Sequence, residues 1–306
     1  MTVAARSCPV CATTSLGAPV FLEESIDPRR LSDYSFSSRK VPEFMSHRLV
    51  ICPGCRLVYV PTPPGQDALA VAYHDAAYDS VQEAHDAASS YAEAIAPILQ
   101  KLAHREAALE IGTGSGVFLE RLKDAGFGKL VGVEPSVAAI RAAAPHRQAW
   151  IREGIFNEHD FEPASFDLVC CFMTMEHVAE PGQLAASALR LLRPGGAFVT
   201  VTHDYRSIVN RMMGRRSPIV DVEHMQLFSD PSLHELYRRA GFADVTVKTF
   251  TNRYALSYWL RLAPLPGPAK RAFAVLLERT GLARAKLGVN VGNSIAAGFR
   301  AAKLTP

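Results

Sequence analysis

The chain has 306 residues, 48% of them hydrophobic and 21% charged, and its 33 basic and 30 acidic side chains give a net charge of +3. Such a composition is typical of a globular protein with a large core, built as one domain with a small module or as two domains. The near balance of charge argues against a nucleic-acid or membrane partner, and no run of about eighteen apolar residues is present, so we expect a cytoplasmic protein.

Two Cys-x-x-Cys pairs, Cys8 with Cys11 and Cys52 with Cys55, account for four of the six cysteines. Each pair can turn two thiolates toward one ion from a tight turn. Together they predict a tetrahedral zinc site that has no open position and is therefore structural. Redox-active or unrelated thiols are the alternative interpretation.

The amino-terminal quarter of the chain forms a separate unit in this interpretation. Residues 1–65 resemble a zinc ribbon with the polar segment 12–47 inserted between the two cysteine pairs. This segment either covers a ligand or folds over the ribbon. Segment 61–65 contains three prolines and a glycine and predicts the boundary of the module. Residues 66–105, which follow it, are rich in helix formers and are expected to form a helical cap.

A glycine-rich turn follows the cap. The apolar run that ends in Glu110 predicts a strand, and an amphipathic helix is expected from Val117 onward. Glycines let the backbone approach a ligand closely, and the N–H groups of a helix start favour polar or anionic groups. The Gly-x-Gly-x-x-Gly pattern of dinucleotide sites fails in both registers, and no phosphate-loop Gly-Lys-Ser/Thr follows. Between strand and helix the chain carries Gly112, Thr113, Gly114 and Gly116.

Further strands are expected downstream in a regular order. Residues 129–134 predict a second strand that ends in Glu134, about twenty residues past the glycines, and Pro135 then leads into a helix. Residues 149–152 predict a third strand. The continuous apolar run 166–172 predicts a central parallel strand. The remaining pattern comprises a helix ending at 193–196, a strand at 197–202, a helix at 231–240, a strand at 244–250 and a last strand at 290–300.

This succession of motifs resembles the core of the class I S-adenosylmethionine-dependent methyltransferases over roughly residues 95–250. The resemblance implies an α/β fold, namely a seven-stranded Rossmann-like sheet with helices on both faces and an antiparallel last strand beside the fifth, in addition to the small zinc ribbon. It implies S-adenosyl-L-methionine as the cofactor. The methyltransferase domain is then 66–306, with 66–105 as its cap and 203–230 and 251–290 as insertions on the acceptor side.

The same resemblance assigns cofactor contacts. Glu110 is expected to bond the cofactor's amino group, and Glu134 its ribose diol. Ile155 or Phe156 is expected against the adenine ring, and Tyr78, together with Tyr73, at the methionine end. The alternatives are a purely structural glycine turn, a Glu134 that caps the next helix, and tyrosines that pack between cap and core.

Two Glu-His pairs are the candidates for chemistry. Glu176-His177 follows the strand that faces the methyl donor in this fold, and a histidine there is suited to accept a proton near neutral pH. Alternatively, His177 bonds the backbone and Glu176 caps the next helix. His224, after Glu223, lies in a loop that borders the acceptor in the family and is the second candidate base. The basic stretch 206–217 holds an acidic acceptor or is a solvated helix face.

The ribbon and core together resemble bacterial methyltransferases that include the deoxysugar C-methyltransferases, whose further carboxyl-terminal domain is not part of this sequence. We therefore expect methyl transfer to a small-molecule acceptor, a metabolite or glycan, in bacterial natural product biosynthesis, with oxygen as the attacked atom and carbon as the second choice. An RNA methyltransferase with an RNA-binding ribbon and a non-catalytic cofactor-binding protein are the alternatives. The near-neutral charge argues against the former and the intact motifs against the latter. A homodimer through segment 251–290 is left open.

Overall fold

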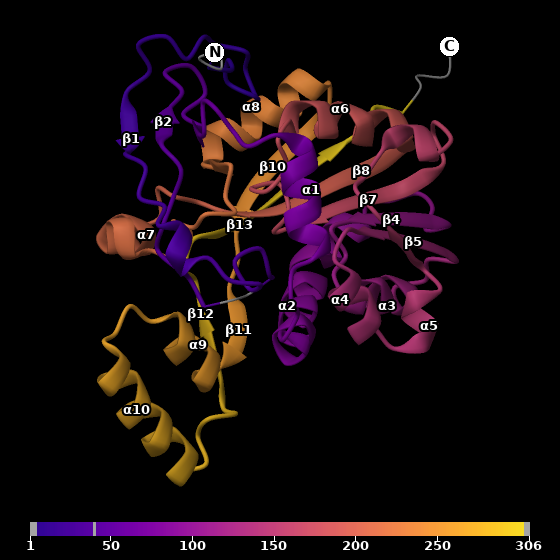
Figure 1. Cartoon of the computed structure of the whole chain (residues 1–306). Helices are drawn as coiled ribbons and strands as arrows, with labels where there is room; N and C mark the ends of the chain where they lie inside the picture. Colours follow the sequence, from indigo (N-terminus) through magenta and orange to yellow (C-terminus); the bar gives the residue numbers. More distant parts are fainter. Residues whose placement is uncertain (1–4, 39–40, 303–306) are drawn as a thin grey trace.

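The computed structural model describes residues 5–38 and 41–302. Its centre is a seven-stranded sheet in the order β10-β13-β8-β7-β4-β5-β6 (Figure 1). β13 is antiparallel between β8 and β10, and the other neighbours are parallel. The predicted α/β class, the seven strands and the antiparallel last strand are thus confirmed. The strands are β4 (Ala107–Ile111), β5 (Lys129–Glu134), β6 (Ile151–Glu153), β7 (Phe166–Phe172), β8 (Leu192–His203), β10 (Ala243–Thr249) and β13 (Asn293–Phe299).

Helices cover both faces of this sheet. The side chains of β7 alternate between two apolar clusters, one shared with α2 (Val81–Leu99) and α3 (Val117–Asp124), the other with α6 (Pro181–Leu191) and α8 (Asp230–Ala240). A strand buried on both faces needs the continuous apolar run that the sequence shows. The other helices are α1 (Gln66–His74), α4 (Val137–Ala142), α5 (Pro145–Gln148), α7 (Ile208–Met213), α9 (Leu256–Leu262) and α10 (Gly267–Arg279), with 3-10 turns at Pro28–Arg30, Glu158–Asp160 and Gly214–Arg216.

Two strand boundaries differ from the expected ones. β6 begins two residues later than predicted, at Ile151. β8 begins at Leu192, because the Arg193–Gly196 segment joins the strand in place of separating it from α6. The register between β7 and β8 shifts there, and a β-carbon on Gly196 would lie 2.9 Å from the carbonyl oxygen of Asp167. The close approach explains why a glycine stands at this irregularity.

The amino-terminal module shares its sheet with the rest of the chain. Its strands are β1 (Val20–Leu22), β2 (Leu49–Ile51) and β3 (Val58–Tyr59), and the fourth is β9 (Gln226–Leu227), which belongs to the segment 203–230. β3 pairs with β9 antiparallel, with Val58 opposite Leu227. The module is therefore joined by backbone hydrogen bonds to the loop that carries the second Glu-His pair.

Segment 251–290 forms an arm. β11 (Asn252–Ala255) and β12 (Lys286–Val289) pair antiparallel, with α9 and α10 between them, and α10 lies far from the central sheet in Figure 1. Among the described residues, no helix combines the length and the apolar character that crossing a membrane requires.

Candidate active site

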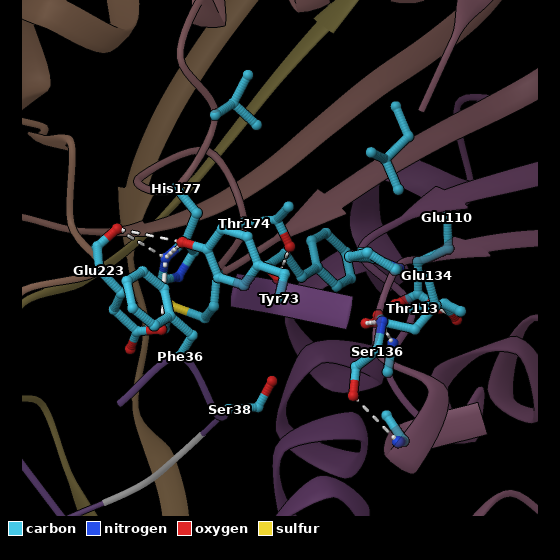
Figure 2. A pocket seen from close by; sticks show the side chains of 18 of the residues that line it. Phe36, Ser38, Tyr73, Glu110, Thr113, Glu134, Ser136, Thr174, His177 and Glu223 are labelled. Carbon is cyan, nitrogen blue, oxygen red and sulfur yellow. Dashed lines mark hydrogen bonds and ion pairs between the residues drawn. The ribbon is translucent and has the colours of Figure 1, made fainter. Parts of the chain in front are cut away.

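A cavity of about 800 Å³ lies at the carboxyl ends of β4, β5 and β7. Parallel sheets place ligand sites at this edge, because the loops that leave neighbouring strands meet there. The cavity has two chemically different ends. Figure 2 shows Glu110, Thr113, Glu134 and Ser136 on one side of the view and His177 and Glu223 on the other.

The glycine turn is built as the sequence predicts. Gly112, Gly114 and Gly116 have φ angles of +75°, +56° and +69°, a region that other residues rarely adopt. A β-carbon on Gly112 would lie 2.2 Å from the hydroxyl oxygen of Thr174, whereas one on Gly114 would meet nothing within 4 Å. Gly112 therefore packs the turn against the end of β7, and Gly114 opens toward the cavity.

Glu134 holds the turn and the next helix together. Its Oε2 accepts the Gly114 N–H at 2.7 Å and its Oε1 accepts the Ser136 N–H at 2.9 Å. Burial raises the pKa of the Glu134 carboxyl, against the opposing effect of these two backbone bonds. The hydroxyl of Ser136 itself caps α4 by accepting the Ala139 N–H. Glu134 thus lies at the cavity wall beside the turn, where its prediction as the ribose acid needs it.

The other predicted cofactor residues line the same end, together with Pro135. Glu110 is buried, and its Oε2 accepts a hydrogen bond from the hydroxyl of Thr113. Ile155 is 50% exposed at the cavity wall, next to the partly buried Phe156, so both can face a flat ring. Tyr78 reaches from the loop between α1 and α2 and bonds the hydroxyl of Ser115 at 3.0 Å.

His177 and His224 meet at the opposite end, with ring centroids 4.9 Å apart. The Nδ1 of His177 lies 3.1 Å from the Tyr73 hydroxyl and 3.3 Å from the Glu223 carbonyl oxygen. The Nδ1 of His224 lies 2.8 Å from the carbonyl oxygen of Ile219. A carbonyl only accepts, so the Nδ1 of His224 carries a proton and its Nε2 is the basic nitrogen. The Tyr73 hydroxyl donates to the Glu223 carbonyl oxygen at 3.3 Å, so its oxygen can accept from a protonated Nδ1 of His177, an arrangement that leaves Nε2 as the basic nitrogen there too.

Burial distinguishes the two histidines. Burial, followed by the neighbouring His177, lowers the pKa of His224 to about 3, so His224 is neutral at physiological pH. The side chain of His177 keeps 18% of its surface exposed and lines the cavity. Burial also raises the pKa of the Tyr73 hydroxyl, with Glu223 and Asp221 adding to the effect, so Tyr73 stays protonated. Among the described residues, His177, Glu223 and His224 are also grouped closely enough for a metal ion, but the Nδ1 bonds to carbonyls suit proton chemistry better.

Glu176 lies behind these histidines and does not line the cavity. Its Oε1 accepts the His203 N–H at 2.8 Å, and its side chain is 1% exposed. Burial would raise the pKa of Glu176, but the hydrogen bond from His203 and the nearby imidazoles lower it below its usual value. Glu176 caps no helix, since the first turn of α6 begins after Glu180 with no side-chain cap. It therefore does not face the cavity directly, and its catalytic role stays a prediction.

Several residues at the His177 end of the cavity carried no sequence signal of their own. Gln226 donates its side-chain amide to the carbonyl oxygens of Met175 and Val178, which ties the His177 loop to the His224 loop. Phe36, from the segment inserted between the cysteine pairs, packs edge-on against Tyr73 with centroids 5.4 Å apart and lines the cavity. The inserted segment therefore covers part of the cavity. By contrast, the arginines of 206–217 are exposed and outside the cavity lining.

The four cysteines converge as predicted. The Sγ atoms of Cys8 and Cys55 are 3.5 Å apart and those of Cys11 and Cys52 are 3.3 Å apart, and all four side chains are buried. The two turns also have the same backbone pattern. The residue after each second cysteine, Ala12 or Arg56, has φ near +60° and donates its N–H to the carbonyl of the first cysteine. The remaining two cysteines, Cys170 and Cys171, lie fully buried in β7.

A family model described as a methyltransferase domain matches residues 84–247, more than half of the chain. The chain belongs to this methyltransferase family. A probable S-adenosylmethionine-dependent methyltransferase of Mycolicibacterium smegmatis is 32% identical over 151 residues, which are 47% of this chain and 56% of that protein. A ubiquinone biosynthesis O-methyltransferase of Burkholderia orbicola is 32% identical over 119 residues, 35% of this chain and 49% of that enzyme.

The methyltransferase chain thus spans about half the length of the curated relatives it matches. Among solved structures, a SAM-dependent methyltransferase of Thermotoga maritima is similar with a TM-score of 0.48 and 22% identity, over 71% of this chain and 92% of that one. The family match covers the glycine turn, Glu134 and the His177 loop, which are the residues that build most of the cavity wall described above.

Proposed function

We propose that this methyltransferase uses S-adenosyl-L-methionine to methylate a hydroxyl group of a small molecule in the bacterial cytoplasm. One observation carries the proposal: a single cavity joins the glycine turn and Glu134 to a cluster of His177, Tyr73 and Glu223. The relatives named as S-adenosylmethionine-dependent and O-methyltransferases support the cofactor and the attacked oxygen. A carbon acceptor remains the second choice, because the same cluster would remove a proton from carbon.

The cofactor end fits S-adenosyl-L-methionine. Gly114 leaves open space where any other residue would place a β-carbon, and Glu134 and Glu110 supply carboxylates to ribose hydroxyls and an amino group. When bound, the cofactor supplies a methyl group on a positively charged sulfur, which is already activated for transfer. The protein therefore has to position the acceptor, exclude water and take up one proton.

His177 is the residue that takes up this proton. As the oxygen–methyl bond forms and the sulfur–methyl bond breaks, the hydroxyl proton passes to Nε2 of His177. The Glu223 carboxylate, with Oε2 3.7 Å from His177 Nδ1, stabilises the imidazolium that results. Glu223 and Asp221 are two carboxylates near His177 and Tyr73 that line the cavity, so a neutral or cationic acceptor is favoured over an anionic one.

We also propose that Cys8, Cys11, Cys52 and Cys55 hold one structural zinc ion. Sulfur atoms 3.3–3.5 Å apart are too far for a disulfide and close to the edge of a zinc–thiolate tetrahedron. Zinc would supply folding energy at this closed site and no chemistry at the cavity.

Binding and turnover test the proposal separately. Calorimetry should give micromolar S-adenosyl-L-methionine affinity, weakened about tenfold or more in Glu134→Ala through loss of a charged hydrogen-bond acceptor. The exposed Glu162→Ala is the matched control. Labelled methyl transfer to a panel of phenols and neutral sugars should fall about 10²–10⁴-fold in His177→Ala with cofactor affinity unchanged. Absent cofactor binding by the wild type would refute the class, and label in RNA would refute the acceptor.

A further inference from the structure

The arm, residues 252–289, leaves the central sheet after β10 and returns to it at β13. Its base is fixed to α2 by ion pairs, Arg253 with Glu93 at 3.0 Å and Lys286 with Asp86 at 2.9 Å. α10 packs mainly on α9 and lies at the outer end of the arm in Figure 1. The arm thus presents one helix away from the body of the protein on an anchored base.

No residue of α10 is buried, although the helix is amphipathic. Ala269, Ala272, Phe273 and Leu276 follow the i, i+3, i+4, i+7 spacing of one helix face. Phe273 is 51% exposed and Leu276 is 54% exposed, and Leu282 just past the helix is 50% exposed. The arm therefore offers an apolar stripe whose two large side chains stay half exposed in the described part of the chain.

Basic side chains are concentrated in this helix and in the segment that follows it, and Arg279 lies next to the stripe by helical spacing. Residues 267–289 contain five basic residues and one acidic residue, a net charge of +4, while the whole chain carries +3. The rest of the molecule therefore carries −1. Within the described residues, Arg271, Arg279 and Arg284 form no ion pair, and all three are exposed. Lys286 is paired with Asp86 at the base of the arm, and the other four basic residues lie in α10 and in the loop that follows it.

We propose that α10 docks this protein reversibly on an anionic lipid surface. A helix with an apolar stripe and arginines beside it lies in a membrane interface with the stripe in the acyl boundary and the guanidinium groups among the lipid phosphates. The net charge of the whole chain does not indicate this basic segment, because the remainder of the molecule carries a net charge of −1.

Other occupants fit the surface less well. The stripe of a thirteen-residue helix, about 20 Å long and 10 Å wide, offers roughly 200 Å², against about 800 Å² per partner in a stable dimer. A two-fold contact through the stripe would also place Arg279, which lies beside the stripe, in a like-charged interface between the two copies. A nucleic acid would pair with the arginines but would leave Phe273 and Leu276 without an apolar partner.

The position of the arm relates this surface to the cavity. Tyr254, Tyr258 and Trp259, at the base of the arm, line the acceptor side of the cavity. The proposed lipid-binding helix and these cavity-lining side chains therefore belong to the same arm of the chain. The residues of α10 itself do not line the cavity, so they can be changed without altering cofactor contacts.

Vesicle flotation of the full chain tests the proposal. Vesicles of phosphatidylcholine with phosphatidylglycerol should bind the protein at low salt, and pure phosphatidylcholine vesicles should bind it at least about tenfold more weakly, because each arginine near an anionic surface contributes about fivefold. The double variant Phe273→Ser/Leu276→Ser should bind the anionic vesicles about tenfold or more weakly. Leu16→Ser/Val71→Ser, at apolar positions that are 89% and 60% exposed elsewhere, is the matched control and should bind like the wild type.

Charge-reversal variants give a second, independent test, made of one variant in α10 and one control variant elsewhere. Arg279→Glu should weaken binding to anionic vesicles about tenfold or more, and the exposed Arg141→Glu should not. Equal binding to both vesicle types, no binding by the wild type, or insensitivity to the α10 variants would overturn the proposal. So would a wild-type dimer, seen by sedimentation, that the double variant dissociates while vesicles stay unbound. Cofactor affinity, measured alongside, should stay unchanged in every variant, so failure of docking is distinguishable from failure of the proposed function.

Discussion

Gly112 and Gly114 stand two residues apart in one turn, yet they face different surroundings. Gly112→Ala should destabilise the fold by about 3 kcal/mol or more, because its β-carbon would overlap Thr174 as well as strain a positive φ. Gly114→Ala should cost about 1 kcal/mol from φ alone but should weaken cofactor binding, because the methyl group would enter the cavity. Urea unfolding and calorimetry on both variants measure the two effects. Equal losses of stability would show that the turn does not pack on β7 as described.

His224 makes stability depend on pH. Its folded pKa is lowered to about 3 from an ordinary 6.5, so below pH 6.5 the unfolded chain binds a proton that the folded chain does not. The free energy of unfolding should therefore fall with decreasing pH from about 6.5 toward 3, by up to about 1.4 kcal/mol per unit. His224→Gln should flatten the dependence between pH 7 and 5 relative to the exposed His104→Gln. Parallel pH profiles for both variants would mean that His224 is not buried as a neutral group.

At the scale of elements, the two cysteine turns are expected to depend on zinc. Cys52→Ser should remove the ion and destabilise the protein by about 4 kcal/mol or more, as loss of a structural metal does. Cys170→Ser is the control, since it buries the same hydroxyl at a site that is also fully buried but lies in β7, outside the cluster. It should keep one zinc per chain and lose less stability. Elemental analysis measures the zinc content of each variant, and thermal unfolding measures its stability. A zinc-free wild type would contradict the assignment.

For the whole molecule, the pairing of β3 with β9 has a consequence for unfolding. The module and the methyltransferase sheet also share one apolar cluster, in which Cys52 and Leu57 lie with Phe166. We expect calorimetry to show a single unfolding transition, which a zinc chelator shifts to lower temperature as one peak. Two resolved transitions would show that the module folds independently, as a self-contained unit of 1–65 would.

Much of the fold, and the end of the cavity that holds the glycine turn, could be predicted because the sequence patterns that indicate them lie within short segments of the chain. Glu110, the glycines and Glu134 lie within short strand–turn–helix units, and the carboxyl edge of parallel strands brings such units together in a fixed order. The family match confirms the methyltransferase prediction. The individual site roles and the zinc ion stay predictions that the proposed experiments test.

The acceptor end is different, because its members come from distant parts of the chain. Tyr73 and His177 are 104 residues apart and His177 and Glu223 are 46 apart, and only the packing of cap, strand loop and insertion brings them within hydrogen-bond distance. The burial that makes His224 neutral and sets Glu176 behind the cavity is likewise a property of the assembled fold. The amino-acid sequence by itself determined the succession of strands and helices along the chain, the glycine turn and the two cysteine pairs, because spacing and backbone geometry encode them within short segments. The tertiary structure alone decided which loops meet around His177 and that the apolar side chains of α10 stay exposed, because both depend on contacts between segments far apart in the chain.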